Sequence, residues 1–159
     1  MIRKVIAEDK DTVIDLIWQF KKEALDKTKV SFNKNTLSNR IDMSIEQDNP
    51  CIFICYEGNV GVGIISGLIV KSFFDDNQIL AMELVWYISE NYRGKSYGRD
   101  LLRKFEEYAK SKGASNIIMI AGHYSINMRK DKLLDYFYTK NGYVKLETHY
   151  IKNLEQGGE

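Results

Sequence analysis

Apolar and polar positions follow two periods along the chain, and the changes between these periods divide it into short elements. Runs rich in β-branched and aromatic residues predict strands at residues 2–7, 51–56, 60–72, 79–88, 116–121, 143–146 and 148–154. Helical spacing of apolar residues predicts four helices, whose buried stripes span residues 13–25, 37–45, 101–109 and 133–138. The predicted order is therefore β-α-α-β-β-β-α-β-α-β-β.

This order predicts an α/β (α+β) protein with a central sheet of about seven strands flanked by four helices. Hairpin turns near residues 57–59 and 75–78 predict antiparallel neighbours, whereas the strand–helix–strand order over residues 79–121 predicts one parallel pair. The sheet is thus expected to be mixed and mostly antiparallel. A length of 159 residues predicts a single domain over residues 1–159, with residues 154–159 as a loose tail.

The stretch from Glu83 to Gly113 reads as a strand, a glycine-containing turn over residues 91–98, and a helix. The first N–H groups of a helix have no partner within it, and the helix dipole places partial positive charge there. Glycines allow the backbone to approach a phosphate closely. With Arg93 and Lys95 at its rim, this turn predicts a site for a diphosphate.

Two common nucleotide motifs do not fit the turn. Gly94-Lys95-Ser96 imitates the end of a P-loop, but that motif requires glycine at position 89, which holds Ser89. The G-x-G-x-x-G pattern is also absent from the turn. The glycines at positions 58, 61 and 63 are followed by an apolar strand, which indicates hairpin-turn and strand positions.

The segment Arg93-Gly-Lys-Ser-Tyr-Gly98 resembles the R/Q-x-x-G-x-G/A signature of the GCN5-related N-acetyltransferase (GNAT) superfamily. The middle glycine of that signature is Ser96 here. A second segment, Phe137-Tyr-Thr-Lys-Asn-Gly-Tyr143, is similar to the family's Φ-Y-x-K-x-G-F/Y pattern. The element order matches the GNAT fold over nearly the whole chain, and its layout resembles the small members common in bacterial and phage genomes.

The resemblance implies acetyl-CoA as the cofactor. It implies that the pyrophosphate is held by the turn and helix start, at Arg93, Gly94, Lys95, Ser96, Tyr97, Gly98 and Arg99. It also implies that the backbone of Trp86, Tyr87 and Ile88 pairs with the pantetheine arm.

Acetyl transfer to an amine requires removal of a proton from the amine and protonation of the leaving thiolate. Tyr138 falls on the general-acid position of the family, although it would also complete an apolar helix face. Glu83, expected on the same strand face as Val85 and Tyr87, is the first candidate for the base, with a solvated or ion-paired carboxylate as the alternative reading. His123 is the rival base, and His149 a weaker one.

The overall composition narrows the classes of partner. A net charge of +1 without a basic cluster disfavours a nucleic-acid partner, and no apolar run is long enough to cross a membrane. With no signal-peptide pattern, the default expectation is a cytoplasmic protein, and a homodimer is allowed. Cys51 and Cys55 would lie about 13 Å apart on one strand face, too far for a disulfide, and no metal-ligand pattern accompanies them.

The predicted function is transfer of the acetyl group of acetyl-CoA to a primary amine by direct attack in a ternary complex. The alternative is a catalytically silent CoA-binding or regulatory module, which the Ser96 departure keeps open. The acceptor, a small-molecule or protein amine, is not identified by the sequence. Lysines of the first loop do not favour a cationic amine, and several aromatics are available either to line a pocket or to pack in the core: Trp18, Phe32, Phe73, Phe74 and Tyr124.

Overall fold

The computed structural model describes residues 1–25, 30–120 and 128–146. The chain divides into two compact units, one formed by residues 1–20 with 33–120 and the other by residues 21–32 with 121–159. The single domain predicted for residues 1–159 stays a prediction.

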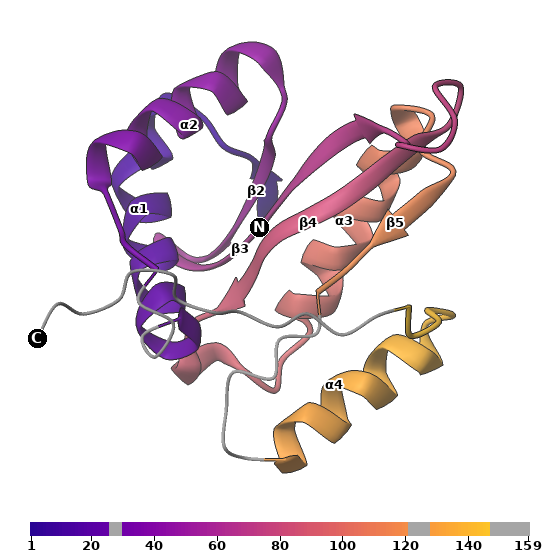
Figure 1. Ribbon diagram of the computed structural model, residues 1–159. Helices are drawn as coiled ribbons and strands as arrows, with labels where there is room; N and C mark the ends of the chain where they lie inside the picture. Colours follow the sequence, from indigo (N-terminus) through magenta and orange to yellow (C-terminus); the bar gives the residue numbers. More distant parts are fainter. Residues whose placement is uncertain (26–29, 121–127, 147–159) are drawn as a thin grey trace, which may run out of the picture. The chain divides into compact units, whose positions relative to one another are not determined.

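The first unit is built on a five-stranded sheet in the order β1-β2-β3-β4-β5 (Figure 1). Its strands are β1 (Ile2–Lys4), β2 (Cys51–Glu57), β3 (Val60–Lys71), β4 (Ile79–Ile88) and β5 (Asn116–Ile118). Strands β1 to β4 pair antiparallel in sequence order, and β5 runs parallel to β4. The predicted mixed, mostly antiparallel sheet is confirmed.

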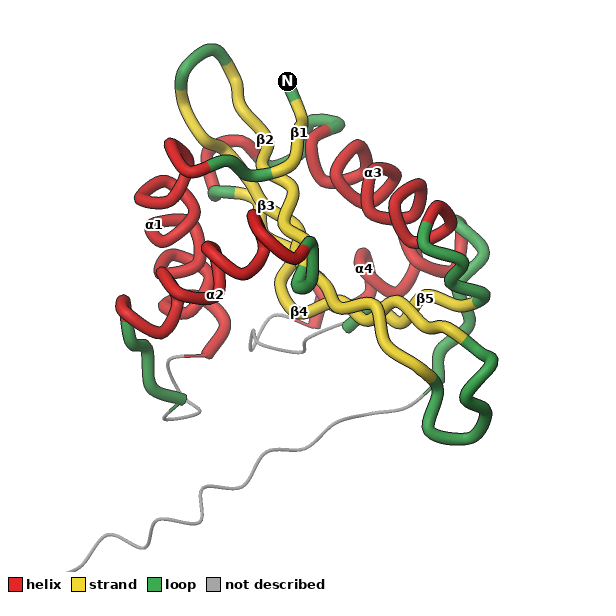
Figure 2. The backbone as a smooth tube through the Cα atoms, turned by 90° about the horizontal axis from the view of Figure 1, so that it is seen from above, coloured by secondary structure: helices red, strands yellow, loops and turns green. Residues whose placement is uncertain are grey.

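Helices cover both faces of this sheet. On one side lie α1 (Lys10–Phe20) and α2 (Lys34–Gln47), and on the other lies α3 (Tyr97–Ser111) (Figure 2). Short 3-10 turns precede α1 at Ala7–Asp9 and α3 at Glu90–Tyr92. Helix α2 begins with a side-chain cap, because Asn33 Oδ1 accepts the N–H of Thr36 at 2.9 Å.

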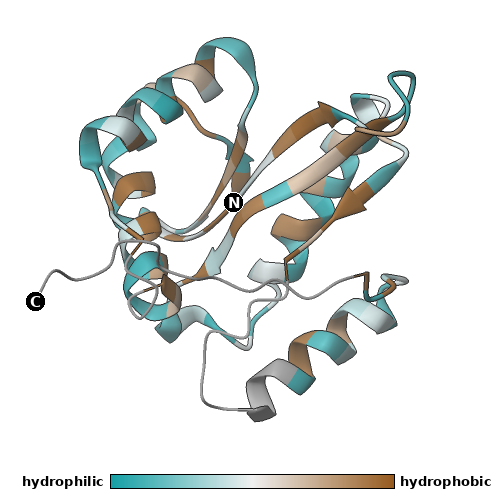
Figure 3. Cartoon of the chain, viewed as in Figure 1, coloured by the Kyte–Doolittle hydropathy of each residue, from teal (hydrophilic) through white to brown (hydrophobic). Residues whose placement is uncertain are grey.

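Helix α3 packs directly onto the middle of β3, because Gly67 leaves room for an aromatic ring. A Cβ at this position would lie 2.3 Å from Cζ of Phe105 and 2.7 Å from the backbone oxygen of Met82, so no other residue fits without displacing the ring or the neighbouring strand. Phe105 and Leu101 are fully buried on the inner side of α3. Hydrophobic residues are concentrated on the strands, and hydrophilic residues on the outer sides of the helices (Figure 3).

The second unit contains a π-helical segment, Lys21–Leu25, and helix α4 (Met128–Lys140). Helix α4 begins at Met128, five residues before the predicted apolar stripe of residues 133–138. Its first residues, Met128, Arg129 and Lys130, are good helix formers, so the helix extends through them. Beyond the end of α4, Gly142 has a φ of +83°, the left-handed conformation that glycine commonly adopts after a helix C-terminus.

Among the described residues, five strands are present, whereas about seven were predicted for the whole chain. Residues 143–146 were predicted to form a strand but lie outside regular secondary structure, and the side chains of Val144 and Leu146 are 90% and 76% exposed. An apolar alternating segment becomes a strand only when a neighbouring strand supplies hydrogen bonds and packing, and no such neighbour is present in the described part of this unit. The predicted strand at residues 148–154 and the tail lie outside the described residues.

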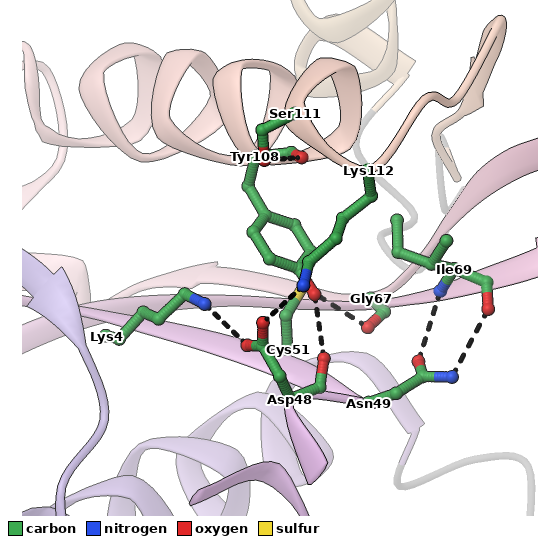
Figure 4. Close-up of polar contacts among 9 residues, drawn as sticks. All are labelled: Lys4, Asp48, Asn49, Cys51, Gly67, Ile69, Tyr108, Ser111 and Lys112. Carbon is green, nitrogen blue, oxygen red and sulfur yellow. Dashed lines mark hydrogen bonds and ion pairs between the residues drawn. The ribbon is translucent and has the colours of Figure 1, made fainter.

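A polar cluster joins α2, β1 and α3 at the edge of the first unit (Figure 4). Asp48, the left-handed C-cap of α2, lies between Lys4 and Lys112, with Oδ–Nζ distances of 2.6 and 3.0 Å. The Tyr108 hydroxyl donates a hydrogen bond to the backbone oxygen of Asp48 at 2.8 Å. Asn49 then forms two hydrogen bonds with the backbone of Ile69, of 3.1 and 3.2 Å. The loop after α2 is thus tied to β3 and α3.

Both cysteines are buried in β2 and are free, as predicted. Burial raises the pKa of the Cys51 thiol to about 11, and it also raises the pKa of Cys55. They act as small apolar residues of the core.

A buried carboxylate, Asp9, holds the turn before α1 against two strands. Arg3 of β1 binds both of its oxygens, Tyr56 of β2 donates at 2.6 Å, and the N–H of Ile6 donates at 2.8 Å. Burial alone would raise the pKa of Asp9, but the hydrogen bonds from Arg3, Tyr56 and Ile6 together lower it below the ordinary value.

Replacing Asp9 with alanine is expected to lower the free energy of unfolding by about 2 kcal/mol, because three donors lose a buried acceptor. Asp42→Ala provides the control, since Asp42 pairs with Lys10 at an exposed position and should change stability by less than about 0.5 kcal/mol. Urea unfolding measures both variants. Equal effects of the two substitutions would contradict a central role for Asp9.

Candidate active site

The turn before α3 has the geometry of an anion-binding helix start. Gly94 has a φ of +82°, a conformation that favours glycine, and the chain enters the helix at Tyr97. Asp100 is the first residue whose N–H bonds within the helix, to the oxygen of Ser96 at 2.9 Å. The N–H groups of residues 97–99 therefore precede the helical hydrogen-bond ladder.

This helix start lies against the end of β4. A Cβ at Gly98 would lie 3.5 Å from Cζ2 of Trp86 and 3.7 Å from Cγ1 of Ile88, which are ordinary contact distances. The helix was predicted to begin at residue 99 but includes Gly98 in its first turn. Gly98, one of the residues predicted to bind the pyrophosphate, is therefore adjacent to Trp86 and Ile88, which were predicted to bind the pantetheine arm.

The positive side chains of the turn already have partners within the protein. Lys95 Nζ lies 2.7 Å from Glu57 Oε1 at the end of β2, and the Tyr97 hydroxyl donates to the same oxygen. Hydrogen bonds from Lys95 and Tyr97 lower the pKa of Glu57. Arg93 Nε donates to the backbone oxygen of Ile88 at 2.8 Å. Sequence reasoning missed Glu57, because nothing local links this hairpin residue to a turn 40 residues away.

A second missed residue lies on α1. Oε1 of Gln19 accepts hydrogen bonds from the Ser89 hydroxyl at 3.0 Å and from the Tyr87 hydroxyl at 3.5 Å. The end of β4 is thus held by α1 on one face while α3 starts on the other. An exposed glutamine in a helical pattern carries no signal for this role.

Strand β4 contains a β-bulge next to the candidate base. Val85 pairs with Ser66 and Glu83 pairs with Gly67, so Leu84 has no partner residue in β3. Such an extra residue interrupts the alternation of side chains along the strand.

The bulge changes the face on which Glu83 lies. Its partner Gly67 faces Phe105 of α3, whereas the Tyr87 hydroxyl contacts Gln19 of α1. Glu83 therefore lies on the α3 face, and the prediction that it shares a face with Tyr87 is wrong. Strict period-two alternation fails here because it takes no account of an inserted residue.

Glu83 is a buried carboxyl group at the point where β4 and β5 stop pairing. The parallel ladder ends with Met82 and Ile118, and the N–H of Ile120 then donates to Glu83 Oε2 at 2.8 Å. The side chain is 7% exposed. Burial raises the pKa of Glu83 to about 7, against the opposing effect of the Ile120 hydrogen bond. A carboxyl group with this pKa exchanges protons near neutral pH.

Tyr138 belongs to the second unit, where it lies in α4 and is buried. Its ring contacts the ring of Tyr143 edge-on at 5.2 Å between centroids, and that of Phe137 at 5.9 Å. The N–H of Tyr143 also donates to the backbone oxygen of Tyr138 at 3.0 Å. The matched segment from residue 137 to 143 therefore folds as a helix end with a packed aromatic cluster.

The other predicted residues divide into two groups. His123, His149 and Tyr124 lie outside the described residues. Phe73 and Phe74 lie in the turn between β3 and β4, and are more than 90% exposed, so they do not pack in the core. Within the described ranges, no helix has the length and hydrophobicity needed to span a membrane.

Comparison with known families gives one match. The model of the acetyltransferase (GNAT) family matches residues 12–143. No curated protein matches the chain.

Solved structures share the fold at low sequence identity. Glucosamine-6-phosphate N-acetyltransferase from Arabidopsis thaliana is 19% identical, with a TM-score of 0.73 and 98% of each chain covered. A Clostridium acetobutylicum protein described as a predicted acetyltransferase, solved with acetyl-CoA, is 16% identical, with a TM-score of 0.72 and coverage of 97% of this chain and 96% of that one. An aminoglycoside acetyltransferase from an uncultured soil metagenomic sample, in complex with sisomicin, is 16% identical, with a TM-score of 0.70 and coverage of 98% and 96%.

Replacing Glu83 with glutamine is expected to raise the free energy of unfolding at pH 8 by about 3 kcal/mol, since one pKa unit corresponds to about 1.4 kcal/mol. The carboxyl ionises near 4.5 when solvated and near 7 in the fold, so the wild-type protein loses stability as pH rises between these values. Glutamine does not ionise, and its carbonyl still accepts the Ile120 N–H.

The measurement is urea unfolding of both proteins at pH 4 and pH 8. The stabilisation should be present at pH 8 and disappear at pH 4. A difference independent of pH would contradict the raised pKa of Glu83.

Proposed function

The chain belongs to the acetyltransferase (GNAT) family, and on this premise we propose that it transfers the acetyl group of acetyl-CoA to a primary amine. The observation that carries the proposal is Glu83, a buried carboxyl group with a pKa near neutrality. It lies on the strand whose far end packs against the helix start of α3. The proposed base for the amine and the proposed site for the cofactor's diphosphate would then lie along one strand.

The cofactor site is formed mainly by backbone groups. The N–H groups of residues 97–99, together with Gly94 and Gly98, would hold the diphosphate at the α3 helix start. The edge of β4 beyond Met82 is not paired with β5 in the described part of the chain. The backbone of Trp86, Tyr87 and Ile88 would therefore bind the pantetheine arm there. These donors fit an extended, diphosphate-containing ligand.

Bound acetyl-CoA supplies an acyl thioester, and the residues of this chain manage the protons around it. An ammonium ion that becomes an acetamide releases two protons as the N–C bond forms and the C–S bond breaks. Glu83 takes one proton and passes it to solvent, while its Oε2 is held by Ile120 N–H. Tyr138 is proposed to donate a proton from its hydroxyl to the leaving sulfur, and the second amine proton restores that hydroxyl.

The cofactor site is tested by Gly98→Asp. A carboxylate at the helix start would stand where the diphosphate binds, so acetyl-CoA affinity should fall by at least about 100-fold. Calorimetric titration with acetyl-CoA, and with ATP for comparison, measures the affinity. In Gly98→Ala the added methyl makes only ordinary contacts with Trp86, so this control should lose far less affinity. If Gly98→Asp bound acetyl-CoA as tightly as the wild-type protein, the α3 helix start would not be the diphosphate site.

The base is tested by the pH dependence of turnover at saturating cofactor and amine. The kcat of the wild-type enzyme should fall as pH drops below about 7, because protonated Glu83 accepts no further proton. Glu83→Gln should lower kcat by about 100-fold or more and remove this limb. Tyr138→Phe should lower kcat but keep the fall of kcat below about pH 7. Cofactor binding without turnover on any amine would instead support a catalytically silent module.

A further inference from the structure

A carboxylate from β2 holds the lysine of the turn that precedes α3. Glu57 is the last residue of β2, and its Oε1 lies 2.7 Å from Lys95 Nζ. The Tyr97 hydroxyl donates to the same oxygen. The ammonium of Lys95 also lies over the rings of Tyr92 and Tyr97, at 5.5 and 5.6 Å from their centroids. We call Glu57, Tyr92 and Tyr97 the lysine clamp.

The direction of the Glu57 side chain follows from the strand that carries it. Neighbouring residues of a strand face opposite sides of the sheet. The Tyr56 hydroxyl reaches Asp9, directly before α1, at 2.6 Å. Glu57 therefore points to the α3 side, where the turn over residues 91–98 leads into the helix. The fold of β2 thus presents a carboxylate to the proposed cofactor site.

The lysine clamp determines which positive side chains of the turn are available to a ligand. Arg93 Nε donates to the backbone oxygen of Ile88, and Lys95 is held by Glu57. Arg99, in the first turn of α3, is exposed and forms no ion pair with any of the described residues. One carboxylate therefore neutralises one of the positive charges beside the proposed diphosphate site.

We propose that Glu57 competes with the cofactor's diphosphate for Lys95 and thereby sets how tightly acetyl-CoA is held. This inference rests on the proposed cofactor site and names a residue that weakens it. A diphosphate at the helix start draws the ammonium away from Glu57, because lysine carries its charge on a flexible four-carbon stem. Separating the ion pair offsets part of this attraction, and it leaves a carboxylate close to the phosphates.

The same competition acts on the product of the proposed reaction. CoA and acetyl-CoA carry the same diphosphate, so Glu57 recaptures Lys95 when either ligand leaves. Release of product is a slow step in many enzymes. The lysine clamp therefore favours the release of CoA after acetyl transfer.

The test compares Glu57→Gln with Glu90→Gln. Each substitution removes one exposed carboxylate near the turn, but Glu90 forms no ion pair with the described residues. Binding of acetyl-CoA is measured by calorimetry at low ionic strength, where charges are least screened. We expect Glu57→Gln to bind acetyl-CoA about threefold to fivefold more tightly than the wild-type protein, the scale on which an exposed ion pair acts. Weaker binding by Glu57→Gln, or an equal gain in Glu90→Gln, would overturn the inference.

A double-mutant cycle identifies the cation for which Glu57 competes. In a Lys95→Met background, Glu57→Gln should leave the affinity within about 1.5-fold, because no ammonium remains for the carboxylate to hold. In an Arg99→Met background the gain should persist, since Glu57 does not hold Arg99. A gain that persists without Lys95 would make Glu57 a general repulsive charge and overturn the inference. Thermal unfolding checks that each variant folds.

The phosphate group is identified with acetyl-dephospho-CoA, which retains the diphosphate and lacks the phosphate on the ribose. Glu57→Gln should bind this analogue with the same relative gain, and loss of the gain would overturn the competition with the diphosphate. The two proposals fail in different ways. Absence of acetyl-CoA binding by the wild-type protein would disprove the proposed cofactor site. Wild-type binding that Glu57→Gln does not strengthen would disprove the competition alone.

Discussion

The close approach of α3 to β3 at Gly67 is the constraint on which the rest of the first unit depends. Because Phe105 occupies the space that a Cβ would fill, the position of α3 across the sheet is defined by steric contact. That contact determines where the helix begins, and its first turn therefore meets the end of β4 at Trp86. An electrostatic feature, the positive helix start, is in this way placed by packing in the apolar core.

The proposed base lies at an irregular place in the sheet. Pairing between β4 and β5 stops at Met82, the bulge lies at Leu84, and Glu83 is between them. Glu83 accepts a hydrogen bond from the N–H of Ile120, which lies beyond the last paired residue of β5. The burial of Glu83 at this point raises the pKa of its carboxyl group. If the β4–β5 ladder continued, a strand residue would accept the Ile120 N–H, and Glu83 would not form this hydrogen bond.

The order of the elements up to α4, the parallel pair and the helix start after the glycine-containing turn could be predicted, because they depend on local periodicity and on glycine positions. Three features could not. The bulge at Leu84 inserts one residue without changing composition, the ion pair of Lys95 with Glu57 joins distant segments, and residues 143–146 have strand-like sequence without a described partner strand. In each case the outcome depends on a neighbour in space that the local pattern does not specify.

The burial of both cysteines in β2 has a practical consequence. Thiolates rather than thiols react with disulfide reagents, and at neutral pH a thiol with a pKa of about 11 is almost entirely protonated. The cysteines of the folded chain therefore react very slowly with such reagents. A thiol released into solution by a reaction can be titrated without interference from the protein. When β2 separates from its neighbours, both sulfurs become reactive at once, and their labelling rate reports the opening of the central sheet.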